Sequence, residues 1–275
     1  MPAVYPAEHV VASFPSENVL LLTMQRAKVN ALNTALWVEI GKHMDVASTD
    51  SDVRCVVLAS GLDKIYTAGL DLTESGLDHD GTDAGRLALQ HRSYIKLLQD
   101  AVSAIERCDK PVIAAVHGVC LGGGIDIIVS ADIRYAAEGS TFSIKEVDVG
   151  LAADVGSLQR LPKTTASASL LNELALTARN FGPQEAYQLG LVSKVVPGDK
   201  EGVLKAALDT AKVIASKSPI ATLGTKHLLT YSRDHTTQEG LEYTRIWNMS
   251  MLQAQDLPDA FAAFATKKPA KFGKL

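Results

Sequence analysis

The chain has 275 residues, of which 47% are hydrophobic and 21% are charged, and its formal net charge is −4. This composition is typical of a soluble globular protein long enough to build a sizeable core. The near-neutral net charge gives no sign of the excess of basic residues that is typical of nucleic-acid-binding proteins. No apolar run is long enough to span a bilayer. The cysteines Cys55, Cys108 and Cys120 are far apart and form no C-x-x-C motif, which argues against a disulfide framework or a zinc ribbon.

The first third of the chain predicts a hairpin, a helix and a buried strand. Residues 9–14 and 19–24 are β-rich and flank a Pro-Ser-Glu-Asn turn. After a loop, Asn33 or Thr34 is expected to cap a helix, and the apolar run 53–59 suits a strand covered on both faces. A small-residue turn at 66–71 and a polar loop at 78–85 precede a helical stripe that runs from Leu87 to Cys108.

The middle of the chain continues this alternation of strands and helices. An apolar strand at 112–116 runs into the glycine cluster Gly122-Gly123-Gly124, which opens a short helix. Further strands are predicted at 132–136, 141–144 and 193–196, and further helices at 158–161, 164–177 and 183–189. From about Gly202 the pattern is helical, with breaks at Pro219 and Pro258.

This order of elements predicts the α/β fold class with right-handed crossovers between parallel strands. We expect two units, a core over residues 1–200 and a helical C-terminal region over 201–275. The helical region has too little apolar surface for a core of its own, so we expect it to pack on the body or on a neighbouring subunit.

Three carboxylates stand out because they lie among valines, alanines, leucines and glycines: Asp126, Glu146 and Asp154. The glycine cluster lets backbone N–H groups approach a ligand, and the start of a helix leaves several of them without internal partners. The acids and the backbone N–H donors together predict a site that transfers protons next to an anion, which the donors stabilise. Each acid taken singly could instead be a helix cap or a loop residue.

Several common motifs are absent. The glycine cluster lacks the third glycine of a dinucleotide fingerprint, and the chain contains no phosphate-binding G-x-x-x-x-G-K-[ST] motif. It also has no G-x-S-x-G elbow. The seven histidines show no metal-ligand spacing, so no metal is predicted.

Several segments carry a family resemblance: 26–33, 66–71, 115–132, 142–161 and 264–268. In these segments the chain resembles the enoyl-CoA hydratase/isomerase (crotonase) superfamily, over nearly its whole length. Residues 145–156 are similar to the Δ(3,5)-Δ(2,4)-dienoyl-CoA isomerases. The resemblance implies a crotonase-like spiral of ββα units with a helical C-terminal oligomerisation region, assembled as a homotrimer or as a hexamer of two trimers.

The resemblance also implies an isomerase that converts 3,5-dienoyl-CoA to 2,4-dienoyl-CoA in the β-oxidation of unsaturated fatty acids. The backbone N–H groups of Ala68 and Gly123 would hold the thioester oxygen and stabilise an enolate. Asp154 is assigned as the base at C2 and Glu146 as the acid at C6, with Asp126 orienting the pair. Three acids in apolar surroundings cannot all be ionised, so one is expected to stay protonated.

The acyl-CoA substrate would also be held by residues outside the acid cluster. The resemblance places Lys28 near the nucleotide, and Phe264 and Lys267 over the adenine or a phosphate. Each lysine taken alone could equally be a solvated surface residue. No cofactor is expected, because coenzyme A is part of the substrate.

Other functions stay open at this point. An enoyl-CoA hydratase or a Δ3-Δ2 enoyl-CoA isomerase would use the same scaffold, and a non-catalytic CoA- or RNA-binding scaffold is the alternative of another class. In the family, hydratases position water between glutamates that correspond to residues 126 and 146. This chain has the shorter Asp126, and it has Asp154 where hydratases usually carry glycine, so both departures favour an isomerase.

The two ends of the sequence give a prediction about location. The first fifteen residues lack a charged segment followed by an apolar one and are not arginine-rich, so no N-terminal import signal is expected. The last three residues, Gly273-Lys274-Leu275, resemble the S-K-L peroxisomal address with glycine in place of serine. The peroxisome is therefore predicted, with the mitochondrion or the cytoplasm as alternatives.

Overall fold

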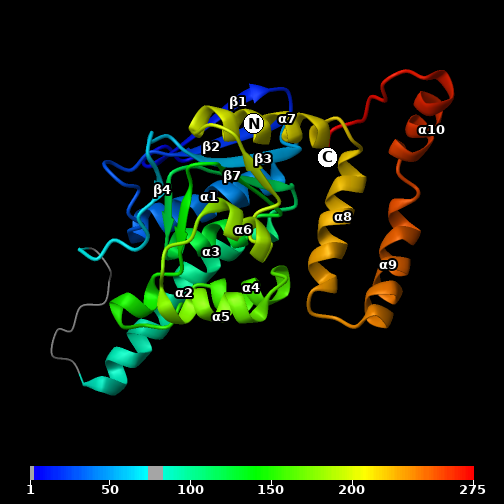
Figure 1. Cartoon of the computed structure of the whole chain (residues 1–275). Coiled ribbons are helices and arrows are strands. Elements are labelled where there is room, and N and C mark those ends of the chain that lie inside the picture. The colour runs from blue at the N-terminus through cyan, green and yellow to red at the C-terminus, as the bar shows by residue number, and fades with distance from the viewer. Residues whose placement is uncertain (1–2, 74–82) are drawn as a thin grey trace.

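The computed structural model describes residues 3–73 and 83–275, and its central element is a six-stranded sheet (Figure 1). The strands are β1 (Val10–Ser16), β2 (Val19–Met24), β3 (Cys55–Ser60), β5 (Val112–Val116), β7 (Ile133–Ala137) and β9 (Lys194–Val196). They lie in the order β1-β2-β3-β5-β7-β9. The hairpin β1–β2 is antiparallel as predicted, and each later neighbour pairs in parallel.

A second, three-stranded sheet consists of β4 (Ile65–Thr67), β6 (Val119–Leu121) and β8 (Thr141–Ser143). Each of these short strands follows a strand of the large sheet, which gives the repeating pairs β3–β4, β5–β6 and β7–β8. The sequence predicted that the strand at 112–116 runs directly into the glycine cluster, and this is wrong, because β6 lies between them. A three-residue strand is too short to show a two-residue periodicity.

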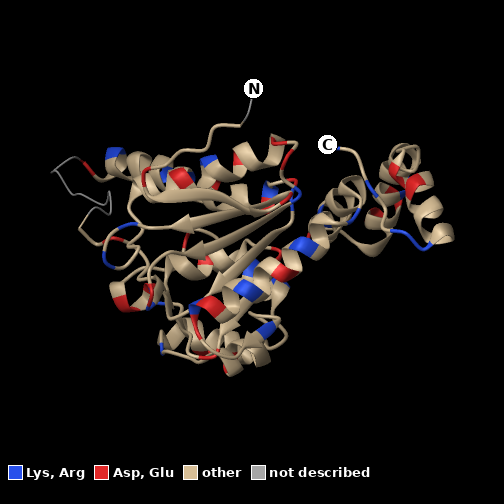
Figure 2. Cartoon of the chain, turned by 90° about the horizontal axis from the view of Figure 1, so that it is seen from above, with Lys and Arg blue, Asp and Glu red and all other residues tan. Residues whose placement is uncertain are grey.

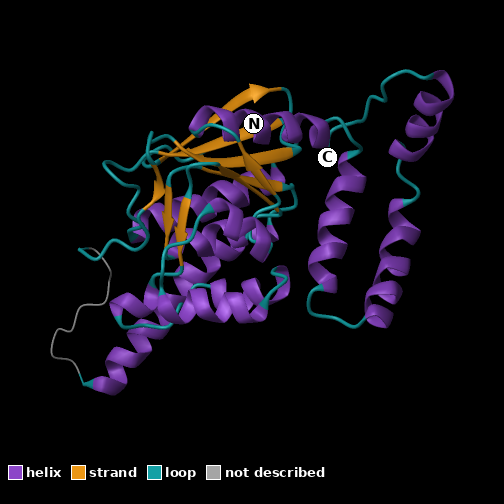
Figure 3. Ribbon diagram, in the orientation of Figure 1, coloured by secondary structure: helices purple, strands orange, loops and turns teal. Residues whose placement is uncertain are grey.

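Helices follow the strand pairs and lie on one side of the large sheet, with α4 and α5 farthest from it (Figures 1 and 3). They are α1 (Thr34–Thr49), α2 (Ala84–Arg107), α3 (Gly123–Val129), α4 (Ser157–Thr164), α5 (Ala168–Thr177) and α6 (Pro183–Leu189). Asn33 caps α1 as predicted, since its side chain accepts the N–H of Leu36 at 3.0 Å. The helix predicted from residue 164 begins later, at α5, because the hydroxyl of Ser167 caps it by accepting the N–H of Leu170.

The polar loop predicted over 78–85 falls mostly on residues 74–82, which lie outside the described part of the chain. Where the description resumes, Asp83 caps α2 by accepting the N–H groups of Gly85 and Arg86. The helix therefore begins at Ala84, three residues before the predicted stripe.

Two apolar cores lie on the two faces of the large sheet. The larger core packs α1, α2 and α3 against one face. The other face is covered by α7 (Lys200–Ala215), seen above the sheet in Figure 1, which places four small residues against the strands at four-residue spacing. These residues are Val203, Ala207, Ala211 and Ala215. The predicted boundary near residue 200 thus coincides with the first residue of a helix that covers the sheet.

The remaining helices stand beside this body: α8 (Pro219–Ser232), α9 (Thr237–Met251) and α10 (Asp256–Thr266) (Figure 1). Pro219 is the first residue of α8, and Pro258 lies in the first turn of α10, so each proline marks a helix start as the predicted breaks require. The chain then returns toward β3, where Arg54 donates to the carbonyls of Phe272 and Gly273 at 2.8 and 2.9 Å.

Charged residues of both signs are interspersed over the body and the C-terminal helices in the view of Figure 2. No helix in residues 3–73 and 83–275 is long and apolar enough to cross a membrane.

Candidate active site

The three predicted acids line one cavity of about 210 Å³ between α1, α2 and α3. Its walls are mostly apolar, and they come from five parts of the chain. The lining residues are Trp37, Ala68, Gly69, Leu70, Leu72, Tyr94, Ile95, Leu98, Gly122, Gly123, Asp126, Lys145, Glu146, Val149, Leu151, Asp154 and Val155. Asp126 is on α3, Glu146 begins a short 3₁₀-helix (Glu146–Val149), and Asp154 lies in the segment before α4.

Asp126 is the most deeply buried of the three acids, with 1% of its surface exposed. One carboxylate oxygen accepts the backbone N–H of Ser157, the first residue of α4, at 2.6 Å. Burial, reinforced by the negative charge of Glu146, raises the pKa of Asp126 to about 7, against the smaller opposing effect of the Ser157 N–H group. A pKa near 7 lets Asp126 hold a proton over part of the neutral range.

Glu146 lies half-buried beside the glycine cluster. Its Oε2 atom is buried and has no hydrogen-bond partner in the described part of the chain, while its Oε1 atom lies 3.3 Å from the position that a Cβ atom on Gly122 would occupy. Burial raises the pKa of Glu146, and the charge of Asp154 adds to the effect. The carboxyl group thus has one oxygen against the glycine cluster and another that is buried without a partner among the described residues.

Asp154 lies half-buried at the other end of the same loop. Its backbone carbonyl accepts a hydrogen bond from Nε2 of Gln99 on α2 at 2.7 Å. Burial raises the pKa of its carboxyl group. All three acids therefore have raised pKa values and face one apolar cavity, which suits proton transfer rather than a solvated acidic surface.

One predicted anion-binding donor is already engaged within the fold. The backbone N–H of Ala68 donates to the carbonyl of Val29 at 3.0 Å, so it is not available to a ligand. Two residues later, Leu70 lines the cavity and pairs with Leu32 in an isolated parallel bridge. That bridge uses the N–H groups of Leu32 and Asp71, and the N–H of Leu70 has no partner among the described residues.

The second predicted donor, Gly123, is the first residue of α3, where N–H groups lack intrahelical acceptors. A side chain at this position would meet the Trp37 ring at 2.7 Å, so only glycine lets the helix start lie against α1. Gly69 has a φ of +87°, and a Cβ atom on it would lie 2.9 Å from the carbonyl oxygen of Leu121. Adjacent strands β4 and β6 thereby bring residues 69–70 next to the glycine cluster.

The residues predicted to bind the CoA moiety do not line this cavity. Lys28 lies exposed in the loop after β2, with a φ of +69°. Phe264 is 88% exposed on α10, and Lys267 is the C-cap residue of that helix. Figure 1 shows α10 on the far side of α8 from the sheet, so one copy of the chain does not bring Phe264 and Lys267 to its own acids.

Sequence reasoning missed Leu70, Trp37 and Gln99. Leu70 looks like an ordinary apolar residue, and only the direction of its N–H group distinguishes it from Ala68. Trp37 occurs on a helix face where aromatic residues are usually core. Gln99 acts through a backbone carbonyl, for which the sequence carries no signal. Within residues 3–73 and 83–275, no group of three or more histidine, cysteine or acidic residues could hold a metal ion.

Comparison with known proteins places these features in a family. Residues 15–274 match the family described as enoyl-CoA hydratase/isomerase. The chain is 49% identical over 266 residues to the mitochondrial Δ(3,5)-Δ(2,4)-dienoyl-CoA isomerase of Homo sapiens, covering 94% of this chain and 80% of that protein. It is 41% identical to the peroxisomal Δ(3,5)-Δ(2,4)-dienoyl-CoA isomerase of Arabidopsis thaliana, covering 98% of both.

Solved structures agree with the fold. The enoyl-CoA hydratase from Bacillus anthracis superimposes with a TM-score of 0.87 at 26% identity, covering 97% of this chain and 99% of that one. The predicted crotonase-like fold is confirmed by this likeness, and the predicted resemblance to dienoyl-CoA isomerases is confirmed by the sequence relatives. The chain belongs to the enoyl-CoA hydratase/isomerase family.

Proposed function

We propose that the chain isomerises 3,5-dienoyl-CoA to 2,4-dienoyl-CoA, a step in the oxidation of unsaturated fatty acids. The relatives named for this activity support the proposal, because they match nearly the whole chain. The observation that carries it is one apolar cavity lined by two half-buried acids and a third, deeply buried one. The reaction moves two double bonds, removing a proton from C2 and adding one at C6, and it needs no cofactor.

The thioester oxygen would lie between the N–H groups of Leu70 and Gly123. Both residues line the cavity, and neither N–H group is engaged elsewhere in the described chain. We propose Leu70 in place of Ala68 because the Ala68 N–H is bound to Val29. Fixed donors at the oxygen stabilise the enolate that forms when C2 loses its proton, and each is typically worth roughly a hundred- to a thousandfold in rate.

The position of Glu146 supports an exchange of the roles assigned from the sequence. Glu146 lies against Gly122, next to the proposed oxygen site, and C2 is bonded to the carbonyl carbon held there. We therefore assign Glu146 as the base for C2, and its Oε2 atom, which is buried and has no partner among the described residues, would take the proton. Asp154 then delivers a proton at C6, and burial favours the protonated form that this step requires.

Asp126 is proposed to orient the pair rather than to contact the substrate. Its hydrogen bond to Ser157 joins α3, which carries the glycine cluster, to the start of α4, two residues after Val155. Its proton reduces the negative charge next to Glu146 over part of the neutral range. Glu146 can then be ionised as a base without an equally charged neighbour.

The same geometry disfavours a hydratase. A hydratase would hold water between the side chains at positions 126 and 146, but Asp126 is buried and its carboxylate is bound to Ser157. A 33% identical relative from Rhizobium meliloti is named a probable enoyl-CoA hydratase, so the scaffold alone does not separate the two activities. The feature that favours the isomerase over the hydratase is Asp154, which supplies an acid at the far end of the cavity.

We further propose that the CoA moiety is held across a subunit boundary in a homotrimer or in a hexamer of two trimers. Lys28 is exposed in the loop that precedes the Leu32–Leu70 bridge, which suits a contact with the nucleotide. Phe264 and Lys267 lie on α10, outside the cavity of their own chain. A neighbouring copy would bring its α10 over the entrance, where an aromatic ring and an ammonium group suit adenine and phosphate.

For location we propose the peroxisome, with the mitochondrion or cytoplasm as alternatives. The support is the Gly273-Lys274-Leu275 ending, together with the Arabidopsis thaliana relative named as peroxisomal. Removing these three residues from a fluorescent fusion tagged at its N-terminus should abolish peroxisomal targeting. If the shortened protein still reached peroxisomes, the address would lie elsewhere.

The function is tested by offering the purified protein a 3,5-dienoyl-CoA and, separately, a 2-enoyl-CoA. The expected result is the rise of conjugated 2,4-diene absorbance with the first and little loss of the enoyl band with the second. Efficient hydration of the 2-enoyl-CoA with no reaction of the diene would overturn the isomerase proposal. No reaction with either would favour a non-catalytic CoA-binding protein.

A further inference from the structure

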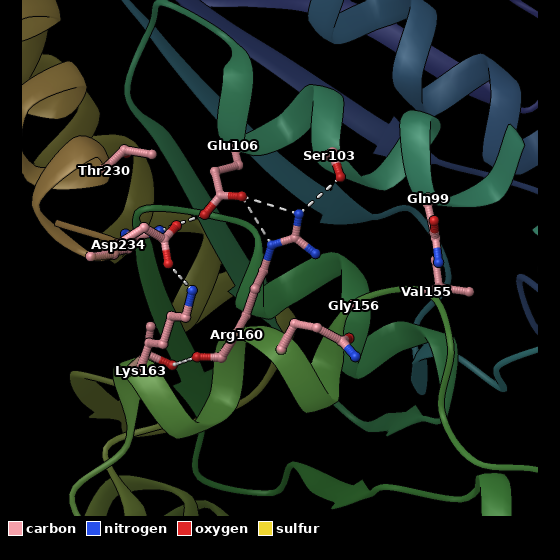
Figure 4. Close-up of a pocket in the computed structure, with 12 residues that line it drawn as sticks. Gln99, Ser103, Glu106, Val155, Gly156, Arg160, Lys163, Thr230 and Asp234 are labelled. Atoms are coloured by element: carbon pink, nitrogen blue, oxygen red, sulfur yellow. Dashed lines mark hydrogen bonds and ion pairs between the residues drawn. The ribbon is translucent and has the colours of Figure 1, made fainter. Parts of the chain in front are cut away.

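A second hollow, of about 420 Å³, lies behind the segment that carries Asp154 (Figure 4). Its walls come from α2, α4 and α8 and are rich in charged side chains. Val155 lines both this hollow and the cavity of the acids, so the two lie on opposite sides of one stretch of backbone. The side chains behind that backbone decide how firmly Asp154 is held.

Three polar residues of α2 face this stretch: Gln99, Ser103 and Glu106. Their spacing of four and three residues puts them on one face of the helix. Gln99 binds the carbonyl of Asp154 at 2.7 Å, while Ser103 and Glu106 both accept from the guanidinium of Arg160, at 2.9 and 3.1 Å (Figure 4). The helix thus contacts the acid-bearing loop both directly and through Arg160.

Arg160 in turn packs on the backbone of Gly156. Gly156 has a φ of +137°, which L side chains rarely adopt, and a Cβ atom there would lie 1.9 Å from Nη1 of Arg160. The guanidinium therefore fills the space where a side chain would be. The Arg160 side chain is only 14% exposed, and its ion pair with Glu106 fixes its plane against the glycine.

We propose that Arg160, held by Ser103 and Glu106, is a positioning residue that fixes Asp154 in reach of the substrate. The inference rests on the proposed role of Asp154. With Gln99 on one side of the loop and the Asp126–Ser157 hydrogen bond on another, Arg160 completes a three-sided clamp on residues 154–157. A displacement of a reacting group by about 1 Å can cost roughly a hundredfold in rate.

Glu106 offers a matched control, because it binds a second arginine for which no hydrogen bond with residues 154–157 is found among the described residues. Arg233, at the end of α8, donates to the other oxygen of Glu106 at 2.6 Å. Arg233→Gln removes one cation from the same carboxylate and leaves the contact with Gly156 in place. Arg160→Lys keeps the positive charge at position 160 but loses the planar guanidinium group. It therefore distinguishes an effect of the guanidinium contacts on the loop from an effect of the charge alone.

The experiment measures kcat, KM and the exchange of the C2 proton with deuterated water for Arg160→Gln, Arg160→Lys and Arg233→Gln. Both Arg160 variants should lose roughly 10- to 100-fold in kcat with little change in KM, while Arg233→Gln stays within about threefold of the parent. Exchange at C2 should persist in the Arg160 variants, because Glu146 is untouched. A normal kcat in Arg160→Lys, or equal losses of kcat and C2 exchange, would overturn the inference.

Two further variants keep the test decisive. If the Arg160 variants do not fold, Gln99→Met removes only the hydrogen bond to the Asp154 carbonyl and should lower kcat several-fold while preserving C2 exchange. An unchanged kcat would then count against the clamp.

Asp154→Asn separates this inference from the proposed function. Normal turnover of Asp154→Asn would refute the role of Asp154 itself, whereas an inactive Asp154→Asn beside fully active Arg160 variants would refute only the clamp.

Discussion

At the scale of single residues, the proposed chemistry depends on three acids that differ in burial and in hydrogen bonding. Asp126 is almost fully buried and bound to a backbone N–H, whereas Glu146 and Asp154 are half-buried at the cavity wall. Burial raises the pKa of all three, most clearly for Asp126. Unequal environments favour one protonated and one ionised acid side by side at neutral pH.

The raised pKa of Asp126 makes the stability of the fold depend on pH. The pKa of Asp126 is higher in the folded state, about 7, than its ordinary value of 3.8. The contribution of this group to the free energy of unfolding is therefore fully present below pH 3.8 and is lost as the pH rises to about 7. Asp126→Asn removes the titration while its amide oxygen can still accept from Ser157. Between about pH 5.5 and 8, the variant should gain about 2 kcal/mol in free energy of unfolding relative to the parent.

Urea denaturation at the two pH values, at fixed protein concentration, measures this difference. Asp209→Asn is the control, because Asp209 is paired with Lys205 and its lowered pKa keeps it ionised throughout the interval. A difference between Asp126→Asn and the parent that does not vary with pH would show that Asp126 is ionised in the fold at all these pH values.

Residue identity alone predicts the three acids that the structure brings to one cavity, but not every proposed donor. Asp126, Glu146 and Asp154 stand out because charge is rare in their surroundings. Leu70 and Ala68 cannot be distinguished in the same way, because the distinction lies in which N–H group the Leu32–Leu70 bridge leaves unpaired. The proposed order of roles between Glu146 and Asp154 likewise rests on the contact with Gly122, which no spacing in the sequence reveals.

At the scale of elements, the small sheet β4-β6-β8 is what assembles the site. Its parallel strands put the turn at Gly69 beside the glycine cluster, and β8 leads into the segment of Glu146. The long apolar strands of the large sheet could be predicted from composition. Of the three-residue strands, the sequence predicts β8 and β9, at 141–144 and 193–196, but not β4 and β6, whose pairing depends on partners far away in the chain.

Helix α8 is joined to the body by a buried ammonium group. Lys226 donates to the carbonyls of Ile105 and Lys110 at 3.3 and 3.0 Å and pairs with Asp132 at 2.9 Å. Asp132 also accepts the N–H of Val112, so it is not wholly dependent on the lysine. The contact links α8 to the end of α2 and the start of β5.

Lys226→Met should destabilise the protein by about 3 kcal/mol, because it leaves a carboxylate and two carbonyls without their donor. Lys205→Met is the matched control, since that lysine is 78% exposed and its pair with Asp209 should be worth less than about 1 kcal/mol. Chemical denaturation of both variants at equal concentration gives the comparison. Equal, small losses would mean that the buried pair contributes no more than an exposed one.

At the scale of the whole molecule, α9 and α10 leave several large apolar side chains exposed on a single copy of the chain. Large apolar side chains on these helices are half or more exposed: Leu241, Ile246, Met249, Leu252, Phe261 and Phe264. Exposed apolar side chains of this size are typical of contact surfaces, in keeping with the proposed trimer or hexamer. A second copy of the chain suits it, because Phe264 and Lys267 are predicted to bind substrate yet lie away from their own cavity.

A charge placed in this surface should therefore break the assembly. Met249→Asp is expected to convert the proposed trimer or hexamer to smaller species, measured by size-exclusion chromatography with light scattering, because an unpaired carboxylate would be buried in the contact. Gln238→Asp, at an exposed polar position of the same helix, should leave the assembly unchanged. A monomeric parent protein, or an unaltered Met249→Asp assembly, would contradict the proposal.

The central claim is that two acids divide the reaction, with Glu146 removing the C2 proton and Asp154 delivering one at C6. Its most direct test follows the C2 protons of a 3,5-dienoyl-CoA by NMR in deuterated water with Glu146→Gln and Asp154→Asn. Asp154→Asn should exchange the C2 protons while forming almost no 2,4-dienoyl-CoA, and Glu146→Gln should do neither. Exchange in Glu146→Gln without exchange in Asp154→Asn would reverse the roles, and near-normal product formation in both would refute the account.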